Sequence, residues 1–497
     1  MNILYVTPEA APFAKTGGLA DVAGALPKHL HDDLQQNVAV IMPFYKKVRE
    51  SGMPTEPTGV EFTIPVGQVT RKATILRSHF PGSDTPIYLV QQDSYFGRDA
   101  LYGEKGIDFK DNCERFVFFS RAVIEAAKRL FPNVEVINCN DWQSALVPVY
   151  MKTLYANDPA ISRAATILSI HNLAYQGLFW HWDMRLTGLD WSLFNWKQLE
   201  YFGKLNVLKS GIVFADSVST VSKTYAREIQ TTEYGVGLES VIQTRADDLY
   251  GIINGIDYAE WNPETDNHIA ATFTPDDLRG KAVCKRELQK RNGLPARPDV
   301  PLIGAISRLD KQKGFDLLED IIDDLMQEDV QFVLLGTGDP KYHKLFEKIA
   351  SDYPQKAGIN LKFDNALAHQ IEAGSDMFLM PSRYEPCGLN QMYSLKYGTV
   401  PVVRSTGGLA DTIVDFGPGT RDRANGFSFV DYTPRTLLET IRRAVRTYYE
   451  PEWQALMRRG MRQDWSWTRS AREYLEMYGK TLLKTGKRQP AQTCSTG

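Results

Sequence analysis

The chain contains few cysteines, and none of them are spaced for a metal site or a disulfide framework. Its five cysteines are scattered over 497 residues without a Cys-x-x-Cys pair, so neither kind of site is predicted. No apolar run approaches the roughly 20 residues of a membrane-spanning helix. The chain begins with a strand-like run instead of a basic segment and an apolar signal core. These absences predict a cytoplasmic protein without a membrane partner.

A strong charge of one sign is also missing. The 57 Lys and Arg residues nearly balance the 60 Asp and Glu residues, giving a net charge of −3. A basic surface for nucleic acid is therefore not predicted. The length, in contrast, is sufficient for two or more domains with large cores.

Short β-rich runs alternate with helical patterns, which is typical of parallel α/β units. The segment from Pro54 to Gln92 alternates like hairpins and predicts an antiparallel insertion. A polar, proline-containing stretch after Asn254 reads as a linker. The fold predicted is two Rossmann-like domains. The expected strands are Ile3–Thr7, Val38–Met42, Val134–Asn138, Ala165–Ile170 and Ser217–Thr220 in the first half, and Pro301–Ser307, Gln331–Gly336, Asn360–Phe363, Asp376–Met380 and Thr399–Val403 in the second.

The hexapeptide Thr-Gly-Gly-Leu-Ala-Asp occurs twice, at Thr16–Asp21 and at Thr406–Asp411. A Gly-Gly pair that opens a helix leaves backbone N–H groups bare at a positive helix end, which suits a phosphate. Gly-Gly also serves ordinary turns. Two copies, one near each end of the chain, indicate that both halves face a common phosphate-bearing ligand. In the first helix, Pro27 is expected to cause a kink.

Ligands of open α/β sheets bind beyond the carboxyl ends of the strands, so the residues after each strand are candidates. His171 follows one strand, although a lone histidine is as often structural. Asp141 follows another and could equally be a helix N-cap. Arg308 and Lys313 after a third strand would bind a diphosphate, although such cations are commonly just solvated. Glu385, between an aromatic residue and a proline before a helix start, is read as a positioned carboxylate.

Together these stretches resemble the bacterial glycogen synthase and plant starch synthase family of retaining nucleotide-sugar glucosyltransferases. The resemblance extends over nearly the whole chain, and the order and spacing of the motifs carry it. The motifs are Lys15–Val22, His171–Gly177, Gly251–Asp257, Ser307–Gly314, Tyr384–Leu389, Ser405–Asp411 and Trp465–Trp467.

The resemblance implies a GT-B arrangement, in which two Rossmann-like domains face each other with the active site in the cleft between them. The expected domains are residues 1–254, with a helix at about 466–482 packing back on them, and residues 255–465. Residues 483–497 are expected to form a flexible tail. Transfer of glucose from ADP-glucose to the non-reducing end of an α-1,4-glucan is the implied reaction.

The family match also assigns roles to residues. Glu385 is expected to lie against the donor glucose, and His171 to hydrogen-bond the primary hydroxyl of the sugar. Arg308, Lys313 and Lys15 match diphosphate-binding cations. Asp141 is expected at the sugar or acceptor side and Asp21 beside the phosphate loop. The further expected substrate-binding residues are Gly17, Gly18, Tyr102, Asn254, Cys387, Gly388, Leu389, Thr406, Gly407 and Gly408.

Two departures from related patterns affect the mechanism. Many retaining transferases carry a second glutamate eight positions after the first, where this chain has Tyr393. A carboxylate pair of the glycosidase kind is therefore not expected, and the family implies a front-face reaction. Bacterial members often read His-x-His-Asp-Trp-His where this chain has Asn138–Gln143, a change that plant starch synthases tolerate.

No Asp-x-Asp motif, the usual cue for a metal-bridged nucleotide-sugar, occurs in the chain. Fixed cations can stabilise a leaving diphosphate instead, so neither a metal nor a cofactor is expected. The alternatives are another GT-B transferase that uses UDP-glucose, such as a sucrose synthase-like enzyme, a nucleotide-sugar epimerase, and a non-catalytic glucan-binding scaffold. A non-catalytic scaffold would be expected to have lost charged residues from the site, whereas the six charged site residues of this chain are all present.

Overall fold

The computed structural model describes residues 1–104 and 106–487, which divide into two compact units. Of the described residues, unit 1 comprises those within 1–221, 226–255 and 467–487, and unit 2 comprises residues 222–225 and 256–466. The chain crosses between the units after Gly255, one residue beyond the expected boundary. At the return crossing, Ile256 N–H donates to the Trp465 carbonyl at 2.8 Å.

Unit 1 is built on a nine-stranded sheet in the order β14-β13-β9-β8-β1-β2-β5-β4-β3. Its first strand carries four consecutive buried residues, as expected for a central parallel strand covered on both faces. The strands are β1 (Asn2–Val6), β2 (Asn37–Pro43), β3 (Glu56–Val66), β4 (Val69–His79), β5 (Pro86–Gln91), β8 (Val136–Asn140), β9 (Ala165–Ile170), β13 (Ser217–Thr220) and β14 (Leu249–Gly251).

The expected antiparallel insertion is present as the β3–β4–β5 meander, and its last strand pairs in parallel with β2. Short strands form two further sheets: β6 (Gly103–Glu104) with β7 (Ile107–Asp108), and β10 (Leu178–Trp180) with β12 (Lys204–Asn206) and β11 (Glu200–Tyr201). The strand expected at Val134–Asn138 begins and ends two residues later. Its shifted end places Asn140 on the strand and Asp141 directly after it.

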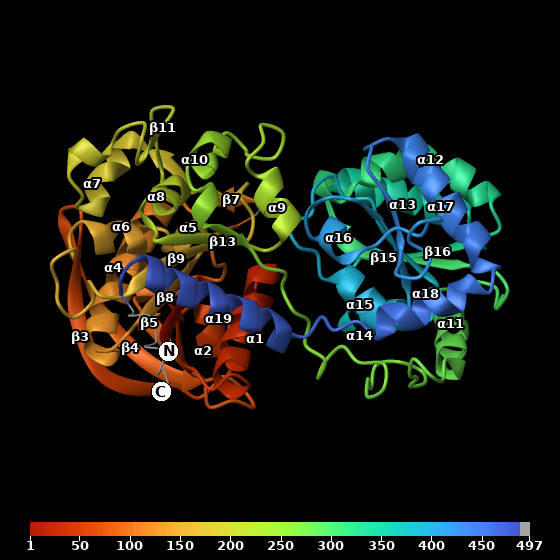
Figure 1. Cartoon of the computed structure of the whole chain (residues 1–497), viewed down its shortest axis with the longest axis horizontal. Helices are drawn as coiled ribbons and strands as arrows, with labels where there is room; N and C mark the ends of the chain where they lie inside the picture. The colour runs from red at the N-terminus through yellow and green to blue at the C-terminus, as the bar shows by residue number, and fades with distance from the viewer. Residues whose placement is uncertain (105, 488–497) are drawn as a thin grey trace, which may run out of the picture. The chain divides into compact units, whose positions relative to one another are not determined.

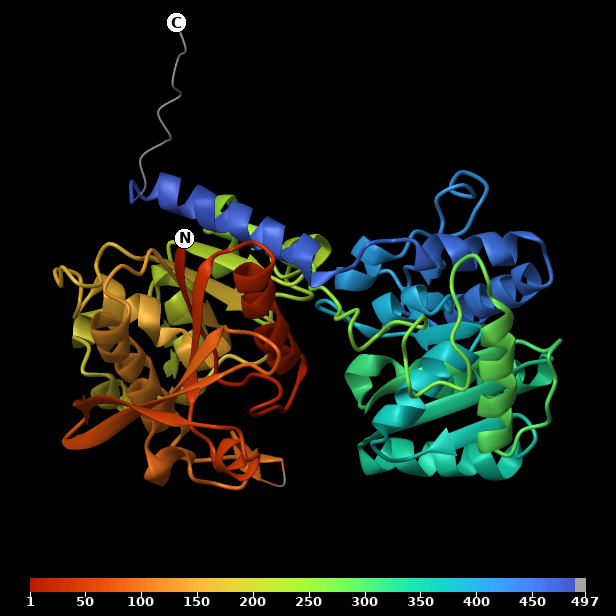
Figure 2. The same ribbon diagram turned by 90° about the horizontal axis from the view of Figure 1, so that it is seen from below.

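Helices cover the unit 1 sheet. Those wholly inside the unit are α1 (Gly18–Asp32), α2 (Lys46–Glu50), α3 (Asp93–Phe96), α4 (Asn112–Leu130), α5 (Asp141–Ser144), α6 (Leu146–Lys152), α7 (Met184–Thr187), α8 (Val207–Phe214), α10 (Glu239–Gln243) and α19 (Trp467–Lys484), and α9 (Lys223–Glu228) spans the division. In Figure 1 the last helix, α19, lies beside the first, α1, and Figure 2 shows the same pairing. α1 continues through Pro27 as one helix.

Unit 2 is a six-stranded parallel sheet in the order β17-β16-β15-β18-β19-β20. Its strands are β15 (Leu302–Leu309), β16 (Gln331–Gly338), β17 (Ala357–Asn360), β18 (Met377–Met380), β19 (Val400–Arg404) and β20 (Phe427–Phe429). Its helices are α11 (Arg279–Arg291), α12 (Phe315–Gln327), α13 (Pro340–Asp352), α14 (Asn365–Gly374), α15 (Asn390–Lys396), α16 (Gly407–Thr412), α17 (Pro434–Tyr448) and α18 (Glu452–Met461).

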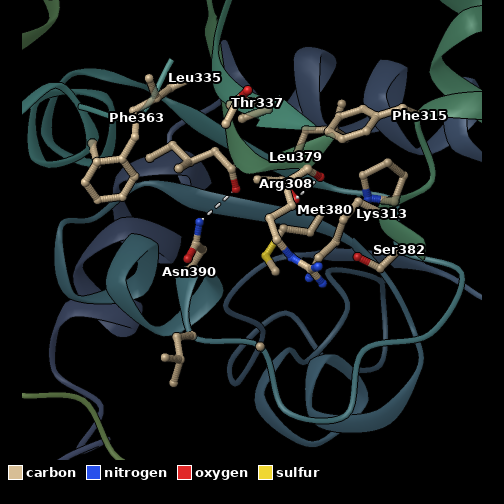
Figure 3. A pocket seen from close by; sticks show the side chains of 18 of the residues that line it. Arg308, Lys313, Phe315, Leu335, Thr337, Phe363, Leu379, Met380, Ser382 and Asn390 are labelled. Atoms are coloured by element: carbon tan, nitrogen blue, oxygen red, sulfur yellow. Dashed lines mark hydrogen bonds between the residues drawn. The ribbon is translucent and has the colours of Figure 1, made fainter. Parts of the chain in front are cut away.

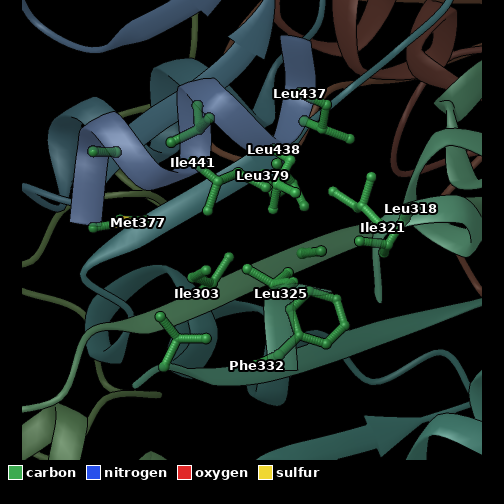
Figure 4. Close-up of a cluster of buried hydrophobic side chains, with 14 of the residues drawn as sticks. Ile303, Leu318, Ile321, Leu325, Phe332, Met377, Leu379, Leu437, Leu438 and Ile441 are labelled. Carbon is green, nitrogen blue, oxygen red and sulfur yellow. The ribbon is translucent and has the colours of Figure 1, made fainter. Parts of the chain in front are cut away.

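The largest cluster of buried side chains in unit 2 lies between the sheet and helices α12 and α17 (Figure 4). Leu318, Ile321 and Leu325 line one face of α12, because residues three and four positions apart share a helix face. Phe332 and Leu379 meet them from the strands. This packing holds the carboxyl ends of β15 and β18 in place.

Three local predictions were wrong. The strand expected at Asn360–Phe363 lies three residues earlier, at β17, because Ala357–Asn360 pairs with β16. The expected linker contains helix α11, and Trp261, Phe273 and Cys284 from this stretch are buried in a common cluster. The tail was expected from residue 483, but α19 continues to Lys484 and Lys487 Nζ donates to the Ala164 carbonyl at 2.7 Å. Residues 488–497 lie outside the described part.

Candidate active site

A pocket of about 340 Å³ opens in unit 2 at the carboxyl ends of β15, β16 and β18. It is lined by five of the sequence-predicted site residues: Arg308, Lys313, Glu385, Gly388 and Leu389. Figure 3 shows Arg308 and Lys313 on the same side as Ser382, with Phe363 at the far side. Parallel α/β sheets bind ligands at this edge, so the position agrees with the sequence prediction.

An ion pair stands at the centre of this site. Lys313 Nζ lies 2.7 Å from Glu385 Oε2, and Ser382 Oγ donates to the same oxygen at 3.0 Å. The carboxylate is almost completely buried, with 8% of its side chain exposed, and the lysine is 20% exposed. Arg308 is 63% exposed, and its guanidinium lies 3.4 Å from the Asp310 carboxylate. The pocket thus has one cation that is fixed by a buried carboxylate, Lys313, and one that is mostly exposed to solvent, Arg308.

Two contacts to backbone carbonyl groups shape the turns around the ion pair. Gly314 has φ +78°, and an added Cβ would lie 2.0 Å from the Pro381 carbonyl oxygen. This approach places Lys313 beside the segment that carries Glu385. At the start of α15, Asn390 Nδ2 donates to the Ile306 carbonyl at 2.9 Å and joins that helix to β15, as the dashed line in Figure 3 shows. The first turn therefore requires glycine, and the second is held by the Asn390 side chain.

The second Gly-Gly pair packs against the same loop. Gly408 N–H donates to the Glu385 and Pro386 carbonyls, both at 3.1 Å. A Cβ on Gly407, which has φ +46°, would lie 2.0 Å from the Glu385 carbonyl oxygen, and one on Gly408 would lie 2.0 Å from the Cys387 carbonyl oxygen. The expectation of bare N–H groups here was wrong for Gly408, because the backbone of the Glu385 loop already uses its hydrogen.

The remaining predicted residues of this unit surround the same loop. Cys387 and Thr406 are buried, and neither lines the pocket. Tyr393, where related transferases carry a second glutamate, stacks on Trp261 with ring centroids 4.0 Å apart. That position therefore serves packing within unit 2.

In unit 1, Asp141 and His171 are brought together at the carboxyl ends of β8 and β9. Asp141 Oδ1 accepts a hydrogen bond from the His171 backbone N–H at 2.7 Å. Asp141 also has φ +53°, a conformation that is uncommon for a residue with a side chain and is found at functional sites. Burial raises the pKa of its carboxyl to about 7. Asp141 is not an N-cap, because it is the first residue of α5 and Asn140 stands at the N-cap position.

The His171 ring is held in one tautomer. Asn140 Nδ2 donates to the Val6 carbonyl at 2.8 Å, so Asn140 Oδ1 faces the ring and accepts from His171 Nε2 at 2.9 Å. The proton therefore resides on Nε2, and Nδ1 is an acceptor. Burial lowers the pKa of the imidazole to about 3, which keeps it neutral. A neutral imidazole whose Nδ1 can accept a hydrogen bond is suited to binding a hydroxyl group.

Glu9 connects this group to the first Gly-Gly loop. Its carboxylate accepts from the Thr16 backbone N–H at 2.5 Å and from the Thr16 hydroxyl at 2.7 Å. Burial raises the pKa of Glu9 to about 6. The Tyr102 hydroxyl is buried nearby, and its pKa is raised by burial, then by the charge of Glu9 and, more weakly, by that of Asp141.

The first Gly-Gly pair is open to solvent. An added Cβ on Gly17 or Gly18 would meet no atom within 4 Å. Lys15 pairs with Asp21 at 2.6 Å across the same loop, and the lysine side chain is 54% exposed. A positive helix end with an adjacent cation and open space is the arrangement expected for a phosphate site.

Asn254 is the last predicted residue of unit 1. It is 5% exposed, and its Oδ1 is buried without a hydrogen-bond partner among residues 1–104 and 106–487. Buried polar atoms are normally paired. Across that same part of the chain, no helix is both long and apolar enough to cross a bilayer, and no three His, Cys, Asp or Glu side chains gather as metal ligands.

Sequence reasoning missed several residues of both sites. Glu9 follows β1, and its place after a strand was an available signal. Ser382 stands three residues before Glu385. Phe363 lay inside a wrongly placed strand, so its position at the pocket could not be foreseen. Leu335 and Thr337 line the pocket from β16, which continues two residues beyond its expected end.

The comparisons with known proteins agree with this architecture. Residues 2–244 match the family described as starch synthase catalytic domain, and residues 287–458 match glycosyl transferases group 1. The chain is 48% identical to a glycogen synthase of Pseudothermotoga lettingae, with 97% of this chain and 99% of the relative covered. A glycogen synthase of Koribacter versatilis is 47% identical, with 97% and 98% covered.

Solved structures give the same result. The catalytic domain of starch synthase IV from Arabidopsis thaliana, bound to ADP and acarbose, matches with a TM-score of 0.87 at 33% identity, covering 97% of this chain and 99% of that one. A sucrose-phosphate synthase from Thermosynechococcus elongatus shares the fold alone, with a TM-score of 0.58 at 16% identity. Two Rossmann-like units of this kind define a glycosyltransferase of the GT-B class. The chain belongs to the glycogen and starch synthase family of glucosyltransferases.

Proposed function

We propose that this enzyme transfers glucose from ADP-glucose to the non-reducing end of an α-1,4-glucan, with retention of the anomeric configuration. The observation that supports the donor site most directly is the Lys313–Glu385 pair beside Arg308 in the unit 2 pocket. Such a pocket offers positive charge for a diphosphate and a buried carboxylate for a sugar. The relatives named glycogen synthase and the ADP-bound starch synthase support the donor and acceptor classes.

The proposed reaction is a front-face displacement. The bond between the anomeric carbon and the diphosphate oxygen breaks, and the glucan hydroxyl oxygen bonds to that carbon from the same face. The hydroxyl proton passes to the departing diphosphate oxygen. The products are ADP and a glucan longer by one glucose. Tyr393 occupies the position of the second glutamate, which supports a path without a glycosyl-enzyme intermediate.

Negative charge grows on the diphosphate as the bond breaks. Arg308 and Lys313 supply fixed positive charge at the pocket, and such preorganised charges stabilise the transition state more than the ground state. We therefore propose a reaction that needs no metal ion. Glu385 is held by Lys313 and Ser382, and we assign to it the sugar hydroxyls and the oxocarbenium-like charge of the transition state.

The unit 1 residues receive complementary roles. His171 Nδ1 is assigned to accept a hydrogen bond from the primary hydroxyl of the glucose, because the opposite nitrogen is fixed by Asn140. Asp141 and Tyr102 are assigned to the sugar or acceptor side. Lys15, Gly17 and Gly18 are assigned to the diphosphate, with Lys15 positioned by Asp21. The residues 1–104 and 106–487 contain no disulfide, and their four thiols are buried, which supports a cytoplasmic location.

A transfer assay tests the proposal. The full-length protein is incubated with glycogen and radiolabelled ADP-glucose or UDP-glucose, and the anomeric configuration of the new bond is read by nuclear magnetic resonance. We expect label in α-1,4-linked glucan, with ADP-glucose used faster. Equal or faster use of UDP-glucose contradicts the donor assignment, and a β-linked product contradicts retention.

A further inference from the structure

The tryptophans of this chain fall into two groups. Trp142, Trp261, Trp453, Trp465 and Trp467 are each at most 9% exposed. The other four all lie within residues 180–196, and their exposed fractions are 60% for Trp180, 43% for Trp182, 43% for Trp191 and 73% for Trp196. A cluster of exposed aromatic rings on one short segment is characteristic of a binding surface.

Three of these rings form a continuous row. Trp180 contacts Trp182 with ring centroids 6.3 Å apart, and Trp182 contacts Trp191 at 5.6 Å, both edge to face. His181 lies between the first two, 5.3 Å from Trp180 and 5.2 Å from Trp182. The Arg185 guanidinium lies 4.7 Å from the Trp182 ring centroid. We call Trp180, Trp182 and Trp191 the tryptophan row.

The row is anchored to the candidate active site of unit 1. It begins on β10, which directly follows the His171–Gly177 loop. In this strand Trp180 is exposed, and Phe179 points to the other face and packs on Trp142 with ring centroids 5.5 Å apart. Trp142 is the residue after Asp141. One side of the strand therefore contacts the site, and the other side carries the row.

We propose that the tryptophan row binds the α-glucan acceptor behind the sugar that receives the new glucose. This inference rests on the proposed function, because it takes the polymer to be the acceptor. A pyranose ring has an apolar face of C–H groups that packs on an aromatic ring. Its hydroxyls require polar partners, which His181 and Arg185 provide beside the rings. The spacing between the rings is comparable to the length of a hexose unit.

The position favours a glucan over a second protein chain. A polymer bound near Asp141 must continue away from the site, and the row extends from the strand that contacts Trp142. A protein partner at the same rings has no comparable reason to begin at the acceptor side. The neighbouring charges are mixed, since Asp183 and Arg185 oppose each other in sign, so a strongly charged ligand is not favoured.

The proposal is tested by comparing three full-length proteins: wild type, a Trp182→Ala/Trp191→Ala variant and a Tyr449→Ala control. Tyr449 is a 60% exposed aromatic residue of unit 2. Glycogen binding is measured without donor by co-sedimentation, and transfer is measured with glycogen and with a short maltooligosaccharide. We expect the double variant to bind glycogen at least tenfold more weakly and to raise KM for glycogen, with kcat for the short acceptor unchanged. Tyr449→Ala is expected to match wild type.

A single Trp180→Ala variant keeps the proposal testable if the double variant does not fold. It is expected to weaken glycogen binding while the thermal unfolding midpoint stays at the wild-type value. Unchanged glycogen binding in the variants, or absence of binding by wild type, overturns the proposal. So does loss of a dimer in the variants with glycogen binding intact, which identifies a second copy as the occupant. Failure of wild type to transfer glucose contradicts the proposed function instead, because binding is measured without donor.

Discussion

The two copies of Thr-Gly-Gly-Leu-Ala-Asp are identical in sequence, but their glycines and their aspartates have different surroundings. At the first copy, Gly17 and Gly18 face open space at the start of a 15-residue helix. At the second, Gly407 and Gly408 are buried and lie against the carbonyl groups of the Glu385 loop. The glycines of the first copy leave room for a ligand, and those of the second leave room for the protein backbone.

The terminal aspartates of the two copies differ in the same way. Asp21 pairs with the exposed Lys15. Asp411 accepts hydrogen bonds from the Thr224 backbone N–H at 2.9 Å and from the Thr224 hydroxyl at 2.6 Å, within unit 2. A short glycine motif therefore predicts that another group approaches the backbone closely. The tertiary structure determines whether this group is a phosphate or another segment of the chain.

The largest effect is expected from the two cations of the unit 2 pocket, which lie on the side of the second glycine motif. Lys313→Ala should lower kcat by two to three orders of magnitude, because removal of one preorganised transition-state contact costs about 3–4 kcal/mol. Arg308→Ala should act in the same direction. Steady-state kinetics with ADP-glucose and glycogen measures both. EDTA should leave the wild-type rate unchanged, whereas a rate abolished by chelation and restored by Mg²⁺ would contradict the role of these cations.

Gly408→Ala should have the next largest effect, this time on folding. Its Cβ would lie 2.0 Å from a backbone carbonyl oxygen, and overpacking of this kind costs about 1–3 kcal/mol, occasionally more. Chemical denaturation measures the free energy of unfolding. The matched control is Gly18→Ala at the first copy, which should leave that free energy within about 0.5 kcal/mol of wild type. Equal destabilisation by the two substitutions would remove the distinction between the copies.

Asp141→Asn should change the pH dependence of stability. The pKa of Asp141 is raised to about 7 from about 3.9 in the unfolded chain. Its stabilising contribution is therefore complete below pH 4 and is lost as pH rises to 7. Relative to wild type, the variant should therefore become more stable to unfolding over this interval by a few kcal/mol, because the pKa difference of about three units corresponds to about 1.4 kcal/mol per unit. Parallel curves from pH 4 to 7 would show that Asp141 is not responsible.

Lys15→Ala should have the smallest effect on stability. Its ion pair with Asp21 is exposed, and such pairs contribute about 0–1 kcal/mol. The free energy of unfolding should hardly change, while the apparent affinity for ADP falls because a cation leaves the open loop. Isothermal titration with ADP measures this fall. Asp21→Asn serves as a control that keeps the cation, and equal affinities for ADP in Lys15→Ala and wild type would exclude Lys15 from the diphosphate site.

Much of the fold could be predicted because alternating β-rich and helical patterns are local signals. The strands Ala165–Ile170 and Ser217–Thr220 were located to the residue. Segments whose structure depends on distant partners were placed wrongly. Trp261 and Phe273 are buried against side chains far along the chain, so their stretch reads as a polar linker from sequence. Strand β17 is defined by pairing with β16, which no local pattern reports.

The candidate site also has parts that local sequence signals could predict and parts that depend on distant contacts. Glu385, Lys313 and Asp141 could be chosen as candidates from the sequence, because they follow strands and match family motifs. The Glu9 contact with Thr16 and the fixed His171 tautomer depend on side chains that converge only in the folded unit. The cleft expected between the two domains stays a prediction of the sequence.

Hydrogen exchange of the backbone, measured by mass spectrometry with and without ADP, tests the division between the two glycine pairs most directly. In free protein, the amides of residues 404–412 should exchange slowly, because Gly408 N–H is already bonded, and those of Gly18 and Leu19 at the start of α1 should exchange quickly. Addition of ADP should protect Gly18 and Leu19 and change residues 404–412 little. Fast exchange at residues 404–412 in free protein, followed by protection with ADP, would contradict the account.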